Sequence, residues 1–109
     1  MAFKIIYITY PDKQTAERIS KKLVDLKLVA CANIFPIHSM YWWDSKVEND
    51  DEWVSLVKTR TSNIKAVEKE VIAIHPYEVP CIMSMDVHAN KDYEDWIHQQ
   101  TKNYLQPKP

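Results

Sequence analysis

Residues 3–10 read Phe3-Lys4-Ile5-Ile6-Tyr7-Ile8-Thr9-Tyr10 and are followed by Pro11. The run is rich in β-branched and aromatic residues, which predicts a β-strand, and the proline predicts a turn because it cannot donate a hydrogen bond to a neighbouring strand. Side chains of a strand alternate between its two faces. One face here carries Phe3, Ile5 and Tyr7, and the other carries Ile6, Ile8 and Tyr10. A half-solvated antiparallel strand would alternate apolar with polar residues, so neither face of this strand is expected to meet water.

Two later segments have the residue spacing of amphipathic helices. From residue 16 the apolar residues recur every three or four positions, and Asp12 is a candidate N-cap for this helix. The same spacing returns from residue 64, after the cap candidates Thr61-Ser62-Asn63, and the second helix is expected to end near His75-Pro76. The two apolar stripes are Ala16, Ile19, Leu23 and Leu26, and Ile64, Val67, Val71 and Ile74.

Three further strands and one more helix are predicted. Residues 28–41 read as a long strand that is bent, bulged or at a sheet edge at Pro36, and a hairpin turn at residues 43–46 joins it to a return strand from about residue 48 to 59. The charged residues 48–52 are interpreted as the solvated end of that return strand. Residues 81–87 form the fourth strand, and a short terminal helix begins around Asp92.

The resulting order, βαββαβ followed by a short C-terminal helix, predicts an α+β fold of the ferredoxin-like kind. In this arrangement right-handed crossovers place both long helices on one face of an antiparallel sheet. The return strand is also apolar on both faces, with Trp53 and Val57 on one and Val54 and Leu56 on the other. Two helices cover only one face, and an uncovered apolar face marks an interaction surface, so self-association is expected from pattern and topology alone.

Length and charge narrow the function classes. The 109 residues are expected to form a single domain over residues 1–109. Lys and Arg number 14 against 15 Asp and Glu and are scattered, so no basic face for nucleic acid is expected. Apolar stretches are too short to span a membrane, and the chain enters its first strand without a signal peptide, which predicts a cytoplasmic protein. Cys31 and Cys81 are expected to be free thiols.

Four segments stand out for their order and spacing. They are Leu28-Val29-Ala30-Cys31-Ala32-Asn33-Ile34, Tyr41-Trp42-Trp43 with Lys46 and Glu48 after it, His75-Pro76-Tyr77-Glu78-Val79-Pro80, and Asp92-Tyr93-Glu94-Asp95-Trp96-Ile97. Together they resemble the CutA family, named for divalent cation tolerance, over nearly the whole chain. The resemblance implies a tight trimer in which hairpin strands of neighbouring subunits pair edge to edge around a three-fold axis. This trimer is similar in fold and assembly to the PII signal-transduction proteins.

The sequence contains no glycine, which departs from the pattern of that family. Members of the family generally place glycine in the turn after Tyr41-Trp42-Trp43 and in the loop before the last helix, where a positive φ is convenient. Ser45 and Ala89-Asn90 stand at those places here. Asn and Asp tolerate the left-handed region better than other non-glycine residues, so Asp44 and Asn90 are expected to take a positive φ.

His75 is the candidate metal ligand. It lies at a predicted helix end, and a neutral imidazole is a good ligand for Cu or Zn. A histidine in the last turn of a helix also caps carbonyl groups and complements the helix dipole, which is the structural alternative. Some members of the resembled family carry a Cys in the first strand and a second His beside this one, where this sequence has Ile8 and Ile74.

Four other side chains offer donor atoms without a recognisable spacing: Cys31, Cys81, His38 and His88. They are on different strands or strand ends and would meet only in the fold; otherwise the histidines lie at the surface and the thiols are packing groups. A Cys–His nucleophilic pair is the enzymatic alternative, but it requires a geometry and an orienting third group that a sequence does not show. The protein is expected not to be an enzyme.

Aromatic residues are abundant, and two roles are open for them. Tyr41, Trp42, Trp43 and Trp53 are predicted to form the trimer interface, because aromatic side chains supply much of the buried area at subunit contacts. The alternative is a pocket between subunits in which Lys58, Tyr77 and Glu78 face a small anionic ligand. No glycine-rich phosphate loop is present, so no organic cofactor is expected.

These observations leave three hypotheses for function. The first is a trimeric, non-enzymatic protein linked to divalent metal tolerance, with weak binding of copper or another divalent cation. The second is a PII-like sensor of a small ligand in the cleft between subunits. The third is an enzyme of unknown reaction.

Overall fold

A computed structural model describes residues 2–102 of the chain. Along the chain the elements are β1 (Phe3–Tyr10), α1 (Lys13–Asp25), β2 (Cys31–Trp43), β3 (Lys46–Thr59), the short 3-10 helix η1 (Thr61–Asn63), α2 (Ile64–Ile74), β4 (Ile82–Val87) and α3 (Lys91–Gln100). The strands of this part of the chain form one antiparallel sheet in the order β2-β3-β1-β4. The predicted α+β organisation, the βαββαβ order and the short last helix are confirmed.

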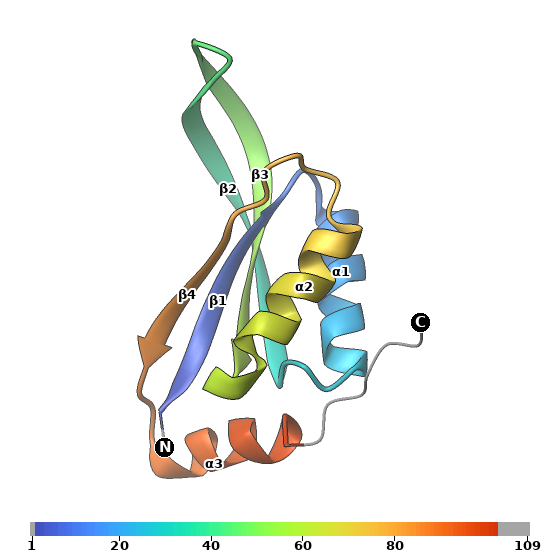
Figure 1. Cartoon of the computed structure of the whole chain (residues 1–109). Helices are drawn as coiled ribbons and strands as arrows, with labels where there is room; N and C mark the ends of the chain where they lie inside the picture. The colour runs from blue at the N-terminus through green and yellow to red at the C-terminus, as the bar shows by residue number, and fades with distance from the viewer. Residues whose placement is uncertain (1, 103–109) are drawn as a thin grey trace.

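The helices α1 and α2 lie side by side on one face of the sheet (Figure 1). The core forms between them and the strands, where Ile6, Ile8 and Tyr10 of β1 are fully buried. The helices contribute Ala16, Ile19, Leu23, Val67 and Val71 to this cluster. All eight side chains belong to the apolar stripes predicted from the sequence, because period-two and period-3.6 patterns each place their members on one face.

The hairpin of β2 and β3 extends well beyond the rest of the sheet (Figure 1). Its register is continuous from the pair Cys31 and Lys58 to the pair Trp43 and Lys46, so there is no bulge at Pro36. Instead, β2 is an edge strand of the sheet, which is one of the settings predicted for a proline.

Three residues other than glycine have a positive φ within the described chain. Asp44 (52°) and Ser45 (65°) form the turn of the β2–β3 hairpin, as expected for a two-residue turn that needs positive φ at both positions. Lys27 (60°) follows α1, where its N–H donates to the Val24 carbonyl oxygen (2.9 Å). This is the position after a helix that glycine commonly fills, and the sequence pattern had not indicated it.

The expected positive φ of Asn90 is wrong. Asn90 has φ −61° and extended backbone, because it is the residue at which the chain enters α3 and an N-cap requires that conformation. Of the predicted helix caps, one is confirmed and one is wrong. Asp12 caps α1 by accepting a hydrogen bond from the Thr15 N–H (2.7 Å), as predicted. Asn63 makes no capping bond to α2, and its amide group instead donates to the carbonyl oxygens of Leu28 and Thr101 (both 3.3 Å).

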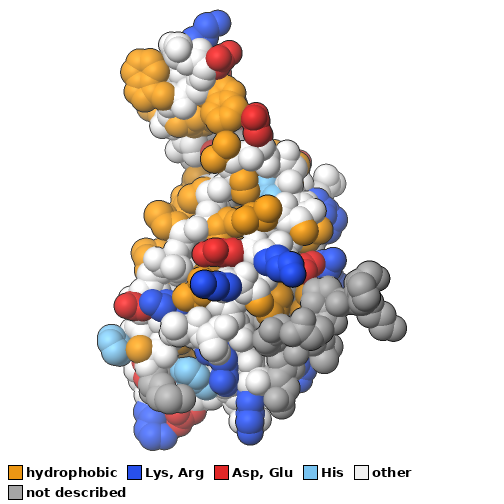
Figure 2. Space-filling view, in the orientation of Figure 1, with side chains coloured by type: hydrophobic (Ala, Val, Ile, Leu, Met, Phe, Trp, Pro, Cys, Tyr) orange, Lys and Arg blue, Asp and Glu red, His pale blue; other side chains and the backbone are white. Residues whose placement is uncertain are grey.

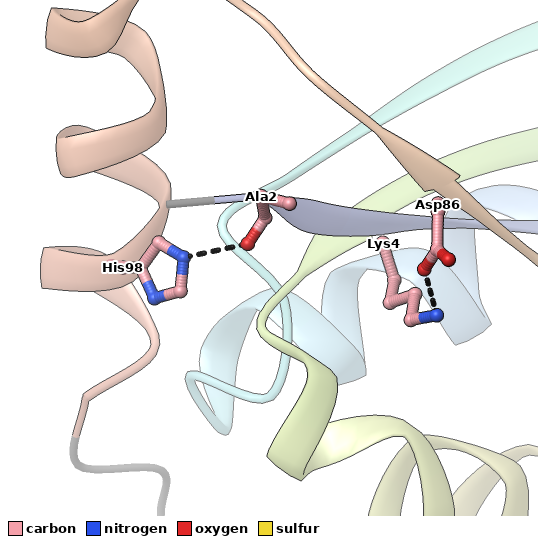
Figure 3. A network of polar contacts seen from close by, with 4 residues as sticks. All are labelled: Ala2, Lys4, Asp86 and His98. Atoms are coloured by element: carbon pink, nitrogen blue, oxygen red, sulfur yellow. Dashed lines mark hydrogen bonds and ion pairs between the residues drawn. The ribbon is translucent and has the colours of Figure 1, made fainter.

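The helix α3 lies across the end of the sheet at which β1 begins (Figure 1). Tyr93 of α3 meets Phe3 edge to face, with ring centroids 6.1 Å apart. His98 reaches the Ala2 carbonyl oxygen (3.0 Å), while Lys4 pairs with Asp86 across β1 and β4 (Figure 3). The sheet face opposite α1 and α2 carries apolar residues that no helix of the described chain covers. They include Met83 and Met85, which are 48% and 42% exposed.

Candidate functional site

A cleft of about 690 Å³ lies on the sheet face opposite α1 and α2, where the hairpin leaves the body of the sheet. Its walls come from β1, from residues 37–41 and 43 of β2, from Glu52 of β3 and from residues 77–79 and 81 of the loop before β4. Tyr7 and Thr9 of β1 share one sheet face with Ile37, Ser39, Tyr41 and Trp43 of β2, because residues two apart on a strand point the same way. The lining residues are Tyr7, Thr9, Ile37, His38, Ser39, Met40, Tyr41, Trp43, Glu52, Tyr77, Glu78, Val79 and Cys81.

Glu52 is the buried acid of this cleft. Its side chain belongs to a residue that is only 8% exposed, and its carboxylate accepts a hydrogen bond from the Tyr77 hydroxyl group. The interpretation of residues 48–52 as a solvated end is therefore wrong for Glu52, although Asp50 and Asp51 are exposed. The signal was present in the sequence, because Glu52 has the same strand parity as Val54 and Leu56.

Burial and the Glu52 carboxylate raise the pKa values of three weak acids that lie near Glu52. Burial, followed by the hydrogen bond to Glu52, raises the pKa of Tyr77 well above its usual value. Burial also raises the pKa of Tyr7 and of the Cys81 thiol, and the negative charge of Glu52 adds to both effects. Cys81 is therefore held as a thiol, which is a poor nucleophile and a poor metal ligand.

His75 lies at the end of α2 with both ring nitrogens engaged. Its Nε2 donates to the Thr9 carbonyl oxygen (2.7 Å), and its Nδ1 accepts from the Tyr77 N–H (3.0 Å). Burial lowers the pKa of His75, so the ring is neutral, and it stacks on Tyr10 with ring centroids 5.4 Å apart. A metal ion at His75 would have to displace one of these two hydrogen bonds. The metal site stays a prediction.

Of the other predicted donor side chains, His38 and Cys81 line the cleft and Cys31 and His88 do not. The Cys31 Sγ contacts the Tyr93 hydroxyl group (3.6 Å), His38 pairs with Asp51 (2.9 Å), and His88 lies 3.8 Å from Glu94. Within residues 2–102, no group of three or more His, Cys, Asp or Glu side chains is placed to hold a metal ion.

The three residues predicted to share a pocket are only partly brought together by one chain. Tyr77 and Glu78 both line the cleft. Lys58 does not line it, and its ammonium group donates instead to Asn33 Oδ1 (2.7 Å) and to the Tyr93 hydroxyl group (3.2 Å) near α3. Sequence reasoning missed Tyr7 and Glu52, which the sheet register brings to the same cleft.

The four aromatic residues predicted to form the interface lie in two different places. Trp42 is 75% exposed and Trp43 is 49% exposed on the hairpin, with Tyr41 beside them. The Tyr41 hydroxyl group donates to Asp50, which raises the pKa of Tyr41 to about 12. Trp53 lies apart from these three: it is partly buried against the core, and the Lys13 ammonium group is 5.7 Å from its ring centroid.

Residues 4–100 match the family described as CutA1 divalent ion tolerance protein. The chain belongs to this family. The resemblance read from the four sequence segments is thereby confirmed, and the match includes every residue that lines the cleft.

Members of the CutA1 family from distant organisms are similar to this chain. The divalent-cation tolerance protein CutA of Archaeoglobus fulgidus is 45% identical over 95 residues, which are 86% of this chain and 93% of that protein. The protein of the same name from Pyrococcus horikoshii is 38% identical over 99 residues, 90% of this chain and 97% of the relative.

Solved structures of CutA1 family members have the same fold. The structure of the periplasmic divalent cation tolerance protein CutA from Archaeoglobus fulgidus superposes with a TM-score of 0.88 at 43% identity, covering 93% of this chain and 99% of the other. The divalent cation tolerance protein Cut A1 from Thermus thermophilus superposes with a TM-score of 0.87 at 38% identity and the same coverage. No helix within residues 2–102 is long and apolar enough to cross a membrane.

Proposed function

We propose that the protein is a non-enzymatic homotrimer of the PII-like, ferredoxin-like type, that it acts in the cytoplasmic response to divalent metal ions, and that it binds copper or another divalent cation weakly. The observation that carries the proposal is the match to the CutA1 divalent ion tolerance family over residues 4–100. The names of the relatives link that family to divalent cations.

The exposed hairpin supports the trimer. Met40 and Trp42 on the edge strand β2 are 71% and 75% exposed, and Val47, which is paired with Trp42 on β3, is exposed as well. Figure 2 shows apolar side chains gathered on this projecting end of the molecule. An edge strand also leaves backbone donors and acceptors unpaired, and pairing with a neighbouring strand satisfies them. Both features favour association through the hairpin.

The geometry of His75 supports weak binding of a metal ion. The ring is neutral, as a metal ligand must be, but its two nitrogens already bond to Thr9 and Tyr77. A metal ion must displace a buried hydrogen bond, which costs about 1 to 3 kcal/mol and lowers the affinity accordingly.

Calorimetric titration with Cu(II) tests this proposal. We expect the parent to bind weakly and His75→Ala to lose at least about tenfold in affinity, whereas the control His38→Ala keeps the parent value. Unchanged binding by His75→Ala would remove His75 from the site. A parent protein that binds no divalent cation would remove metal binding from the function.

The cleft favours a second candidate function, the sensing of a small ligand. Its volume of about 690 Å³ is in the usual range for ligand sites, and the predicted pocket residues Tyr77 and Glu78 both line it. A thermal-shift screen of metabolites on the parent and on Tyr77→Ala tests this function. A ligand that raises the melting temperature of the parent and not of the variant would support it.

A further inference from the structure

The cleft is acidic and aromatic. Among its lining residues are two carboxylates, Glu52 and Glu78, and no Lys or Arg. The remaining titratable base, His38, is already paired with Asp51 (2.9 Å between Nδ1 and Oδ1). Four aromatic rings complete the walls: Tyr7 and Tyr77, together with Tyr41 and Trp43, which also belong to the proposed subunit interface.

Glu52 is a buried carboxylate without a cation. Within the described residues it accepts the hydrogen bond of Tyr77 and forms no ion pair. Carboxylates that are largely removed from water are normally paired with a cation or hydrogen-bonded. The Glu52 Oε1 atom has no such partner within the described residues and is not fully buried, so it is open to a cation in the cleft. One bond to a phenol leaves most of the acceptor capacity of the carboxylate unused.

The surroundings of Glu52 show the effect of this charge. The pKa of Tyr77 and of Cys81 is raised first by burial and then by Glu52, and the pKa of Tyr7 is raised by burial, then by Cys81 and then by Glu52. In each case the neutral form of the neighbour is favoured over the anion. A negative ligand would meet the same repulsion, and a positive ligand would meet the opposite effect.

We propose that this cleft binds a small organic ammonium ion, with its charged nitrogen at the Glu52 carboxylate and its apolar part against the aromatic rings. The inference rests on the second candidate function, ligand binding in the cleft, and assigns the charge of the ligand. The anionic ligand expected from the sequence depends on Lys58, which lies near α3 and does not line the cleft.

The chemistry of the walls matches such a ligand on both of its parts. An ammonium group donates charge-assisted hydrogen bonds to a carboxylate, and its charge is also attracted to the faces of aromatic rings. The rings, together with Ile37 and Val79, supply apolar surface for the body of the molecule. Tight binding of a divalent cation needs several ligands at once, and the described cleft residues include no group of three or more His, Cys, Asp or Glu side chains placed to hold one.

Three probes of nearly the same shape test the charge preference: phenethylammonium, 2-phenylethanol and phenylacetate. Each is titrated into the parent in the presence of a chelator and followed by ligand-observed NMR. We expect phenethylammonium to bind at least about tenfold more tightly than 2-phenylethanol, in line with the strength of a hydrogen bond to a charged group, and phenylacetate to bind most weakly.

Two variants locate the effect. Glu52→Gln keeps the shape of the side chain and an acceptor for the Tyr77 hydroxyl group, and it is expected to abolish the preference for the ammonium probe. Glu78→Gln removes the same charge from the exposed rim of the cleft and is expected to change the affinity by less than about threefold, since exposed charges interact weakly. Thermal melting of both variants establishes that they are folded.

The possible outcomes distinguish the proposed charge of the ligand from ligand binding in the cleft itself. Equal binding of the ammonium and alcohol probes would overturn the inference and leave the cleft as a ligand site. Binding of none of the probes at millimolar concentration would overturn both. The inference would also be overturned if Glu52→Gln bound the ammonium probe as tightly as the parent does. It would likewise be overturned if the main defect of Glu52→Gln were lost self-association, because the cation at Glu52 would then be a side chain of a second copy.

Discussion

Both halves of the β2–β3 hairpin carry large apolar side chains, yet these side chains end up in opposite environments. Next to the body of the sheet, Val54 and Val57 are fully buried, whereas Trp42 and Val47 near the turn are 75% and 55% exposed. The cause is the length of β1, whose pairing with β3 ends at the pair Tyr10 and Trp53. Beyond that pair, no third strand and no helix of residues 2–102 covers the hairpin. The apolar residues of a strand therefore indicate that its surface is buried in the native state. The topology determines whether the same chain or another copy buries it.

Truncating the covered region is expected to have the largest effect. Leu23 of α1 is fully buried against the sheet, so Leu23→Ala leaves a cavity and should lower the free energy of unfolding by about 2 to 5 kcal/mol. Its neighbour Val24 is exposed, and Val24→Ala should change the free energy by less than about 0.5 kcal/mol. Urea denaturation of the two variants measures the difference, and equal losses would mean that the core is not where the structure places it.

A charge on the uncovered half is expected to act through assembly. Trp42→Asp or Trp43→Asp should lower the assembled fraction and the melting temperature together, because the melting temperature of an associating protein depends on its binding equilibrium. The control Ile72→Asp changes a residue of α2 that is 62% exposed and lies away from the hairpin. Sedimentation velocity at micromolar concentration should show loss of assembly in the hairpin variants alone; the same loss in the control would point to a general effect of the charge.

Substitution by glycine at two positions of positive φ, Lys27 and Ser45, is expected to change the free energy of unfolding by about 1 kcal/mol or less. Lys27, after α1, has a positive φ that costs a non-glycine residue about 1 kcal/mol, so Lys27→Gly should stabilise the chain by about that amount. Lys27→Ala keeps the Cβ atom and should not. Ser45→Gly at the hairpin turn should stabilise less in dilute protein, since the end of the hairpin can open without global unfolding. Chemical denaturation measures all three, and stabilisation by Lys27→Ala as large as by Lys27→Gly would contradict the role of φ.

The smallest effects concern two histidines with opposite pH dependence. Burial lowers the pKa of His75, so its contribution to stability is present above pH 6.5 and is lost as the pH falls below that value. The hydrogen bond to Asp51 raises the pKa of His38 in the hairpin, so its contribution is present below pH 6.5 and is lost as the pH rises. Between pH 8 and 5.5, His75→Asn should flatten the acid-side loss of stability and His38→Asn should steepen it. Urea midpoints at several pH values check both signs.

The elements that period and spacing define were predictable. The apolar parity of residues 3–10 and the helical stripes from residues 16 and 64 identified the buried core, and Asp12 was identified as a cap from its position alone. These features are local, so a single sequence determines them.

The cleft was less predictable because it depends on register between distant strands. Glu52 and Tyr77 are 25 positions apart and meet only through the sheet and the loop after α2. The same reason separates Lys58 from its predicted pocket partners, since a side chain six positions along β3 lies at the other end of the sheet. The side-chain bonds of Asn63 and His75 likewise go to backbone groups of remote segments. No periodicity in the sequence reports such contacts.

Sedimentation equilibrium of the parent protein at micromolar concentration tests the central claim, that the uncovered half of the hairpin is covered by other copies of the chain. We expect a mass of three chains of 12.9 kDa each, and no folded monomer across the measured range. A well-folded monomer at these concentrations would contradict the account, because Trp42 and its neighbours would then remain in water.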